Sequence, residues 1–410
     1  MKITSVEAHF LCFPFPEPIK LSYYGGERTI VKRDAMLVRV VTDKGVIGYA
    51  PGQASPRARK AIKEVIAPFL VGRDASDPKA LRAAFVKGPG TDPEDVKVYG
   101  SVEIALYDVA GKIHNKPVSE LLGGRVRDRI RLYASAGMYM EPQGYAAEAA
   151  LAKKLGFTAY KMRPGRGPDA DLETVRQMRE AVGPDFELMV DAHTWWRMGD
   201  RSYSVETVER LSREMAKYRI AWLEESMPPD DHDKYVALTK KKIVPIATGE
   251  HEPSEERFLD LIHRRGSDFV QMDIVCQGGY HLAQRLMPEI DRAGQAFAFH
   301  SWGSVLEVIA AAHVGICYPD KLVPWLEYPC YSTAQNKFMY PFPLATEILK
   351  KPLPIERGEL IVSRAPGLGV EVDESVIERY PWIEGPWSFF RLDSPPGTWA
   401  VTADHSAKWG

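Results

Sequence analysis

The sequence predicts an α/β fold in which a (β/α)8 TIM barrel follows a smaller α+β domain, and two observations predict it. Between residues 128 and 345, eight short β-rich runs alternate with amphipathic stretches of helical length, several of which end at a glycine. Before and after these residues the alternation is lost. A closed barrel is favoured over an open doubly wound sheet, because no run leads into a glycine-rich dinucleotide-binding loop.

Eight strand candidates follow one another in the barrel region. They are RLYAS at 131, TAYKM at 158, FELMVD at 186, IAWLEE at 220, VPIATGE at 244, DFVQMD at 268, AFAFH at 296 and VPWLE at 323. Between them lie helix candidates such as GYAAEAALAKKLG and LETVRQMREAVG. This alternation is typical of βα units around a parallel sheet, so we expect eight parallel strands.

Residues 1–127 and 346–410 have a different character. The first segment contains strand-like KITSVEAHFL and DAMLVRVVTDKGVIGYA, followed by helical patterns such as VYGSVEIALYDVAGKIHN. Between the two strands we expect a long loop from Pro16 to Arg33, with Tyr23 and Tyr24 at its centre, and loops of this length often cover a site. The last segment is rich in Pro and Trp, which indicates an ordered tail packed on the first domain or on a neighbouring protomer.

The composition narrows the class of protein. A chain of 410 residues, 45% hydrophobic and 26% charged, is long enough for one large core and a companion domain. A formal net charge of -2 without a Lys/Arg block argues against nucleic acid or an anionic membrane as partner. No apolar run approaches the ~18 residues of a membrane span, no cleavable leader is evident, and the cysteines lack metal or disulfide spacing. We expect a cytoplasmic protein that acts on a small molecule.

Charged side chains lie at or near the end of seven successive strand candidates. They are Lys161, Asp191, Glu224, Glu250, Asp273, His300 and Glu327. Successive members are one βα unit apart, so a closed barrel would gather all of them at its C-terminal face, where barrel enzymes place their chemistry. Single carboxylates there often only solvate the rim or cap a helix. Three acids on consecutive strands, Asp191, Glu224 and Glu250, instead indicate a site for a hard cation such as Mg²⁺.

The spacing does not choose between Glu224 and its neighbour Glu225. Adjacent side chains on a strand point to opposite faces, so only one of the two can be a ligand. Resemblance to a known family makes the choice. The motifs YKMR, MVDAH, WLEES, GEH, VQMD, QGG, FAFHSW and PWLE resemble those of the enolase superfamily, mandelate racemase subgroup. SVEIALYDVAGKIHNKPVSELLGG is similar to the segment that joins the family's capping domain to its barrel, and GLGVEV to its return after the barrel.

The resemblance implies a modified (β/α)8 TIM barrel with an α+β N-terminal capping domain to which the C-terminal segment returns, and a homo-oligomer. It implies Mg²⁺ held by Asp191, Glu224 and Glu250, a base made of Asp273 and His300, Glu327 as a hydrogen-bond donor to substrate, and Lys161 near the substrate carboxylate. The chemistry fits these groups. Removing the proton beside a carboxylate gives an enediolate, which needs a metal and cations such as Lys161 and Arg163 to stabilise its charge.

Two residues suggest which reaction follows. Several relatives carry a second lysine where this chain has Arg163, and arginine does not give up its proton near neutral pH, so two-base racemisation is disfavoured. His193 lies two residues after Asp191 and should face the same pocket, where it could protonate a leaving hydroxyl, as in the similar galactonate dehydratase branch. His193 as a mere substrate contact is the alternative.

The sequence therefore predicts a Mg²⁺-dependent dehydratase of acid sugars, aldonates or aldarates, that forms a 2-keto-3-deoxy acid with His300 as base and His193 as acid. Two alternatives remain: a racemase, epimerase or cycloisomerase with Lys161 as second base, and a barrel that only binds a ligand. The expected substrate contacts are Arg163, Tyr23, Tyr24, Arg28, His251 and Trp302, although core packing explains the tryptophan equally well.

Overall fold

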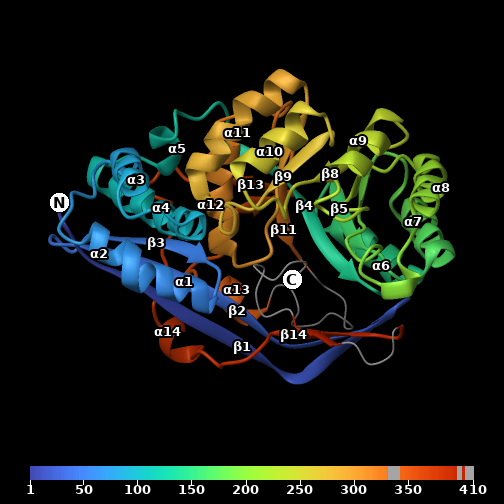
Figure 1. The fold of residues 1–410 in the computed structure, drawn as a ribbon, viewed down its shortest axis with the longest axis horizontal. Helices are drawn as coiled ribbons and strands as arrows, with labels where there is room; N and C mark the ends of the chain where they lie inside the picture. The colour runs from blue at the N-terminus through green and yellow to red at the C-terminus, as the bar shows by residue number, and fades with distance from the viewer. Residues whose placement is uncertain (331–341, 395–398, 402–410) are drawn as a thin grey trace.

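A computed structural model describes residues 1–330, 342–394 and 399–401 of the chain. It has two parts, a parallel barrel and an antiparallel cap whose long strands lie along one side of the barrel (Figure 1). Among the described residues, no helix is both long enough and apolar enough to cross a membrane.

Eight parallel strands form the closed barrel, as predicted. They are β4 (Arg129–Met138), β5 (Ala159–Arg163), β6 (Glu187–Asp191), β7 (Trp222–Glu224), β8 (Ile246–Thr248), β9 (Phe269–Met272), β10 (Ala296–Phe299) and β11 (Leu326–Pro329). Each pairs with the next, and β11 pairs in parallel with β4, which closes the ring. Each of the eight predicted runs contains or overlaps one of these strands.

Helices connect the strands and cover the outside of the barrel. They are α6 (Pro142–Lys154), α7 (Pro168–Val182), α8 (Val205–Ala216), α9 (His232–Lys240), α10 (Glu255–His263), α11 (Gly279–Ala293) and α12 (Val305–Gly315), with a short 3-10 turn η2 (Gly199–Arg201) before α8. Several begin at a side-chain cap: Ser204 accepts from Thr207 N ahead of α8, and Ser254 accepts from Arg257 N ahead of α10.

Aromatic side chains fill the barrel interior below its mouth. Trp222 packs edge-on against Tyr133 with ring centroids 5.3 Å apart, and it also contacts Phe269 and Trp325. Together with small residues from alternate strands they form a core separate from the main one. Because this end is packed, only the C-terminal end of the barrel is left for a site.

The cap consists of three antiparallel strands and a set of helices. They are β1 (Ile3–Tyr23), β2 (Gly26–Thr42), β3 (Ile47–Gly52), α1 (Pro56–Ala61), the π-helical η1 (Ile62–Ile66), α2 (Ala67–Leu70), α3 (Pro78–Lys87), α4 (Pro93–His114) and α5 (Val118–Leu121). Helix α4 starts at the N-cap Asp92, which accepts from Glu94 N, and ends at Asn115 in a left-handed conformation.

The prediction of a long loop from Pro16 to Arg33 is wrong. The two strands stay paired up to Tyr23 and Gly26, and a tight turn joins them. The prolines of this stretch lack a backbone N–H, and the register of the two strands shifts between Pro14 and Ile19. Beyond that shift pairing continues, because residues on alternate positions are buried again.

The tip of this hairpin docks on the barrel loops. Tyr24 N donates to Gly165 O at 2.6 Å, and Arg201 Nη1 donates to Tyr24 O at 2.6 Å. Arg166 Nη1 also donates to the carbonyl of Ser22 at 3.2 Å. The hairpin therefore crosses the barrel mouth and is held at its far end.

The C-terminal segment returns to the cap, as the predicted fold requires. Its elements are α13 (Pro343–Glu347), β12 (Ile355–Glu356), β13 (Glu359–Ile361), α14 (Val376–Arg379), β14 (Ser388–Leu392) and β15 (Trp399–Val401). Strand β14 pairs antiparallel with β2, from Ser388 opposite Ile30 to Leu392 opposite Gly26. Strand β13 instead pairs antiparallel with the start of β4. The first strand, β1, and the last described strand, β15, thus belong to the same sheet (Figure 1).

A glycine lets the cap and the barrel approach closely. A Cβ atom on Gly100 of α4 would lie 2.5 Å from both Gly278 C and Gly279 N at the start of α11. Nearby, Ser101 Oγ donates to Val275 O at 2.9 Å. The neighbouring atoms on the barrel are backbone atoms, which cannot rotate away as a side chain could.

Replacing Gly100 with alanine should therefore destabilise the protein. We expect a loss of about 1–3 kcal/mol from overpacking, larger than the helix propensity that alanine adds. The midpoint of chemical denaturation measures it. Gly144→Ala in α6 is the matched control, since its nearest neighbour is Met140 Cβ at 3.4 Å. Equal midpoints for the two variants would contradict the close contact.

Candidate active site

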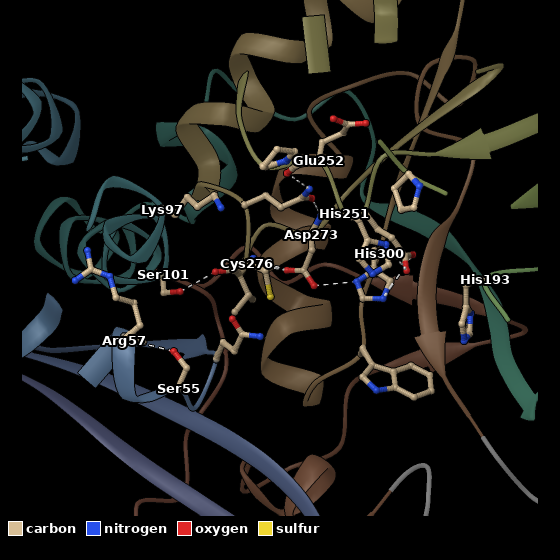
Figure 2. A pocket seen from close by; sticks show the side chains of 18 of the residues that line it. Ser55, Arg57, Lys97, Ser101, His193, His251, Glu252, Asp273, Cys276 and His300 are labelled. Carbon is tan, nitrogen blue, oxygen red and sulfur yellow. Dashed lines mark hydrogen bonds and ion pairs between the residues drawn. The ribbon is translucent and has the colours of Figure 1, made fainter. Parts of the chain in front are cut away.

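A cavity of about 720 Å³ lies between the barrel mouth and the cap. Ser55, Arg57, Lys97 and Ser101 line it from the cap, and His193, His251 and His300 line it from the loops after barrel strands (Figure 2). Its size is that of a small-molecule site. The strand-end residues predicted from the sequence are gathered at or directly beneath its barrel side.

The predicted metal ligands come from three consecutive strand ends. Asp191 Oδ2 and Glu224 Oε1 lie 3.7 and 2.6 Å from the same atom, Lys161 Nζ. Glu250 follows β8, and its Oε2 is buried without a hydrogen-bond partner. Burial raises the pKa of Glu224 and of Glu250, and the Asp191 carboxylate raises both further. Clustered acids with an unsatisfied oxygen fit a hard divalent cation, so this set could hold one.

Glu225 also faces this region. The alternation of side chains stops where β7 ends at Glu224, and Glu225 has a left-handed backbone with φ of 49°. Its carboxyl accepts from Thr248 Oγ1 at 2.8 Å and lies 2.9 Å from His251 Nδ1. Among the described residues, Glu225, Glu250 and His251 are the one set of three whose possible ligand atoms all lie within 4.8 Å of one another, and the predicted trio is not such a set. The two sets share Glu250, so strand alternation alone does not remove Glu225 from the site.

His300 and Asp273 form a hydrogen-bonded pair. His300 Nδ1 lies 2.9 Å from Asp273 Oδ2, and Asp273 Oδ1 accepts from Val275 N and Cys276 N at 2.7 and 3.0 Å. Burial would lower the pKa of His300, but the Glu250 and Asp273 charges raise it well above its usual value. With Nδ1 held by Asp273, Nε2 is the atom available for proton transfer; it lies 3.7 Å from Glu250 Oε2.

His193 lines the same cavity from the loop after β6. Its Nδ1 lies 2.8 Å from Asp191 Oδ1, which leaves Nε2 as the second ring nitrogen. Burial lowers the pKa of His193 to about 4, although Asp191 opposes the shift. A histidine with this pKa gives up its proton more readily than an ordinary histidine, and near pH 7 it is mostly neutral, so it would act as an acid through its minor protonated form.

Lys161, Arg163 and Glu327 form an ionic cluster at the base of the site. Lys161 Nζ is fully buried, 2.9 Å from Glu327 Oε1, and the nearby carboxylates raise its pKa well above the usual value against the effect of burial. Arg163 Nη2 lies 3.3 Å from Glu327 Oε1, Arg163 Nε lies 3.1 Å from Asp191 Oδ2, and its guanidinium stacks on Trp302 at 4.2 Å.

Glu327 is surrounded by cations. Burial would raise its pKa, but Lys161, His300 and Arg163 lower it, and its Oε2 accepts from Ser301 N at 2.8 Å. These contacts describe Glu327 as an acceptor beside Lys161, and its role as a hydrogen-bond donor to substrate, which the resemblance implied, stays a prediction.

Three of the other predicted substrate contacts, Arg28, His251 and Trp302, line the cavity, whereas Tyr23 and Tyr24 do not. Tyr23 is buried against Tyr139, with its hydroxyl donating to Arg391 O at 3.4 Å. Tyr24 is 42% exposed on the outside. The tight turn that replaces the predicted loop explains both positions.

Sequence reasoning missed several cavity residues. Arg197 lies four residues beyond His193 on the same loop. Its place on a loop after a barrel strand could have identified it as a candidate, because such loops build the site of a barrel enzyme. Ser55, Arg57 and Lys97 come from the cap, where spacing along the barrel strands carries no information about position.

Comparison with known proteins agrees with the fold. Residues 6–123 match the mandelate racemase / muconate lactonizing enzyme N-terminal domain, and residues 144–376 match the enolase C-terminal domain-like family. The chain is 29% identical to D-xylonate dehydratase of Haloferax volcanii, over 85% of this chain and 86% of that protein. It is 26% identical to D-galactarolactone cycloisomerase of Agrobacterium fabrum, over 93% and 99%.

A solved structure has the same architecture. The crystal structure of an enolase superfamily member from Polaromonas sp. JS666 superposes with a TM-score of 0.81 at 27% identity, covering 94% of this chain and 99% of that one. Similar proteins thus include both a dehydratase and a cycloisomerase. Since the two family models cover most of the chain in the expected order, the protein belongs to the enolase superfamily, in its mandelate racemase / muconate lactonizing enzyme group.

Proposed function

We propose that this protein is a Mg²⁺-dependent dehydratase of acid sugars. The observation that carries the proposal is that two histidines, His193 and His300, line one cavity together with the carboxylates of Asp191 and Glu250. β-Elimination of water next to a carboxylate needs a base for the α-proton and an acid for the departing hydroxyl, and this pair of histidines can supply both.

In the proposed reaction His300 Nε2 takes the proton from C2 of the substrate, which leaves an enediolate. The hydroxyl at C3 leaves as water with a proton from His193, and the resulting enol becomes the 2-keto-3-deoxy acid. Asp273 keeps the His300 ring in place throughout. A divalent ion held by Asp191, Glu224 and Glu250 would supply Lewis-acid stabilisation of the developing negative charge. Arg163 can hold a substrate oxygen through its planar donor fork.

The main alternative is a racemase, epimerase or cycloisomerase that uses a second base. Lys161 is the residue considered for it, but its ammonium is fully buried between Glu224 and Glu327 and does not line the cavity. These contacts support elimination over two-base chemistry.

A screen of acid sugars with Mg²⁺ in D₂O tests the proposal. We expect a keto acid from at least one aldonate or aldarate, detected by its reaction with semicarbazide. Deuterium at C2 of recovered substrate and of its epimer, without keto acid, would identify a racemase or epimerase instead. If no member of a full stereochemical set reacts or exchanges its α-proton, the proposal is contradicted.

A further inference from the structure

The cavity contains an arginine that makes no ion pair within the described part of the chain. Arg197 Nη2 donates to His251 Nε2 at 3.2 Å, and its guanidinium stacks on Trp196 at 4.4 Å. Its Nε is buried without a hydrogen-bond partner. A largely buried guanidinium that lacks a carboxylate partner is unfavourable, which indicates that an anion binds beside it.

A second arginine reaches the same cavity from the cap. Arg28 of β2 is 6% exposed, and its guanidinium lies between the rings of Trp387 and Phe390, at 4.8 and 4.7 Å from their centroids. Burial lowers the pKa of Arg197 and the Arg28 charge adds to this, while the charges of Glu225 and Glu250 act in the opposite direction, so the two guanidinium groups are close enough to repel. A carboxylate between them would relieve this repulsion and could accept hydrogen bonds from both planar forks.

The distance from the acid cluster suits a short dicarboxylate. Arg197 is separated from Glu250 by one imidazole ring, since His251 accepts from Arg197 at 3.2 Å and its Nδ1 lies 3.6 Å from Glu250 Oε1. The two carboxyl carbons of an extended six-carbon chain are roughly 6 Å apart, given C–C bonds of about 1.5 Å. One carboxylate at the metal ligands would therefore place the other near Arg197.

Cations at the cap end of the cavity are arranged differently. Arg57 pairs with Asp92 and Asp95 at 2.7 and 2.5 Å. Lys97 pairs with Glu94 at 2.9 Å, and Arg257 Nε lies 3.7 Å from Glu252 Oε2. Their charges are neutralised within the protein, so this end suits hydroxyl groups more than an anion.

We propose that Arg197 and Arg28 form a clamp for the second carboxylate of the substrate, which makes the substrate an aldarate and not an aldonate. This inference rests on the proposed function, because it assigns the substrate class of the same site. The clamp recognises a terminal carboxylate where an aldonate has a neutral hydroxymethyl group.

Matched substrate pairs test the clamp. We compare galactarate with galactonate and glucarate with gluconate, using the full-length protein with Mg²⁺. For the preferred configuration, kcat/KM should be about 100-fold higher for the diacid, the effect of losing charge-assisted hydrogen bonds. Arg197→Gln should remove most of that preference by slowing the diacid, with less than about a fivefold change for the monoacid.

Two further variants serve as controls for this test. Arg197→Lys retains the charge without the fork and should give an intermediate preference, and it replaces Arg197→Gln if that variant does not fold. Arg257→Gln is the matched control, because it removes a cavity arginine that already has an internal partner. It should leave the ratio between diacid and monoacid unchanged. Equal rates for the two acids in the unmodified protein would overturn the clamp and leave the dehydratase proposal standing.

A binding measurement separates the two proposals if no hexose acid reacts. Galactarate and galactonate have six carbons each and differ in one terminal carboxylate, so without turnover their binding can be compared directly. Galactarate with Mg²⁺ should raise the melting temperature of the unmodified protein, and Arg197→Gln should lose this shift. That result without any keto-acid product would contradict the dehydratase function and support the clamp. No preference for galactarate over galactonate in this measurement would overturn the clamp.

Discussion

Replacing His300 with asparagine is expected to lower kcat for keto-acid formation at least about 1,000-fold, because the only base proposed for the α-proton is removed. Asparagine can still accept from a neighbour but cannot take a proton at neutral pH. Exchange of the α-proton with D₂O should fall by the same factor, since His300 acts before the elimination.

His193→Asn should behave differently. If His193 only protonates the departing hydroxyl, its loss should slow keto-acid formation by about 100-fold or more while exchange at C2 continues. His263→Asn is the control, because His263 is exposed on the barrel surface and pairs with Glu289. Loss of exchange and elimination together in His193→Asn would show that His193 is needed before the leaving step, which contradicts its role as acid.

Substitution of the carboxylates should have the second large effect, on metal-dependent stability. Mg²⁺ at about 100 times its dissociation constant should stabilise the folded protein by about 2.7 kcal/mol, seen as a higher melting temperature. Glu224→Gln and Glu250→Gln should abolish most of this gain, because an amide is a weaker ligand for a hard cation and leaves the site with less negative charge. Activity should be lost with it.

Glu225→Gln identifies which set of residues binds the ion. If Asp191, Glu224 and Glu250 are the ligands, Glu225→Gln should retain the Mg²⁺-dependent rise in melting temperature. If Glu225, Glu250 and His251 hold it, Glu225→Gln should lose that rise and Glu224→Gln should keep it. The second pattern would overturn the predicted trio.

The barrel could be predicted because each strand carries its own signal. A short β-rich run, an acidic or basic residue at its end and a helix after it are local features, and closure turns their regular spacing into proximity. This is why Asp191, Asp273 and His300 are gathered at the cavity in the structure as spacing suggested.

The parts that were missed depend on contacts between distant segments. Pairing of β1 with β2 past the prolines depends on cross-strand partners such as Ile19 and Ile30, which no local pattern of prolines reveals. The orientation of Glu225 follows from the end of β7 and its left-handed backbone. The place of Arg28 in the cavity depends on Trp387 and Phe390, far along the chain. The sequence predicted Arg28 in a loop, whereas in the structure it lies in β2 and packs against these aromatic rings.

The pairing of β14 with β2 has a consequence for synthesis of the chain. The cap sheet needs residues 388–392 beside residues 26–30, so it cannot be complete until residue 392 has left the exit tunnel of the ribosome. All eight barrel strands have emerged by then, and β4 to β11 pair without β14. The barrel sheet can therefore form before this part of the cap sheet, and Trp387 and Phe390 reach Arg28 only after the barrel strands have been translated. A ribosome that stops before residue 387 would release a chain with its carboxylate cluster and histidine pair encoded in full, but with no aromatic cover over the end of the cavity assigned to the second carboxylate.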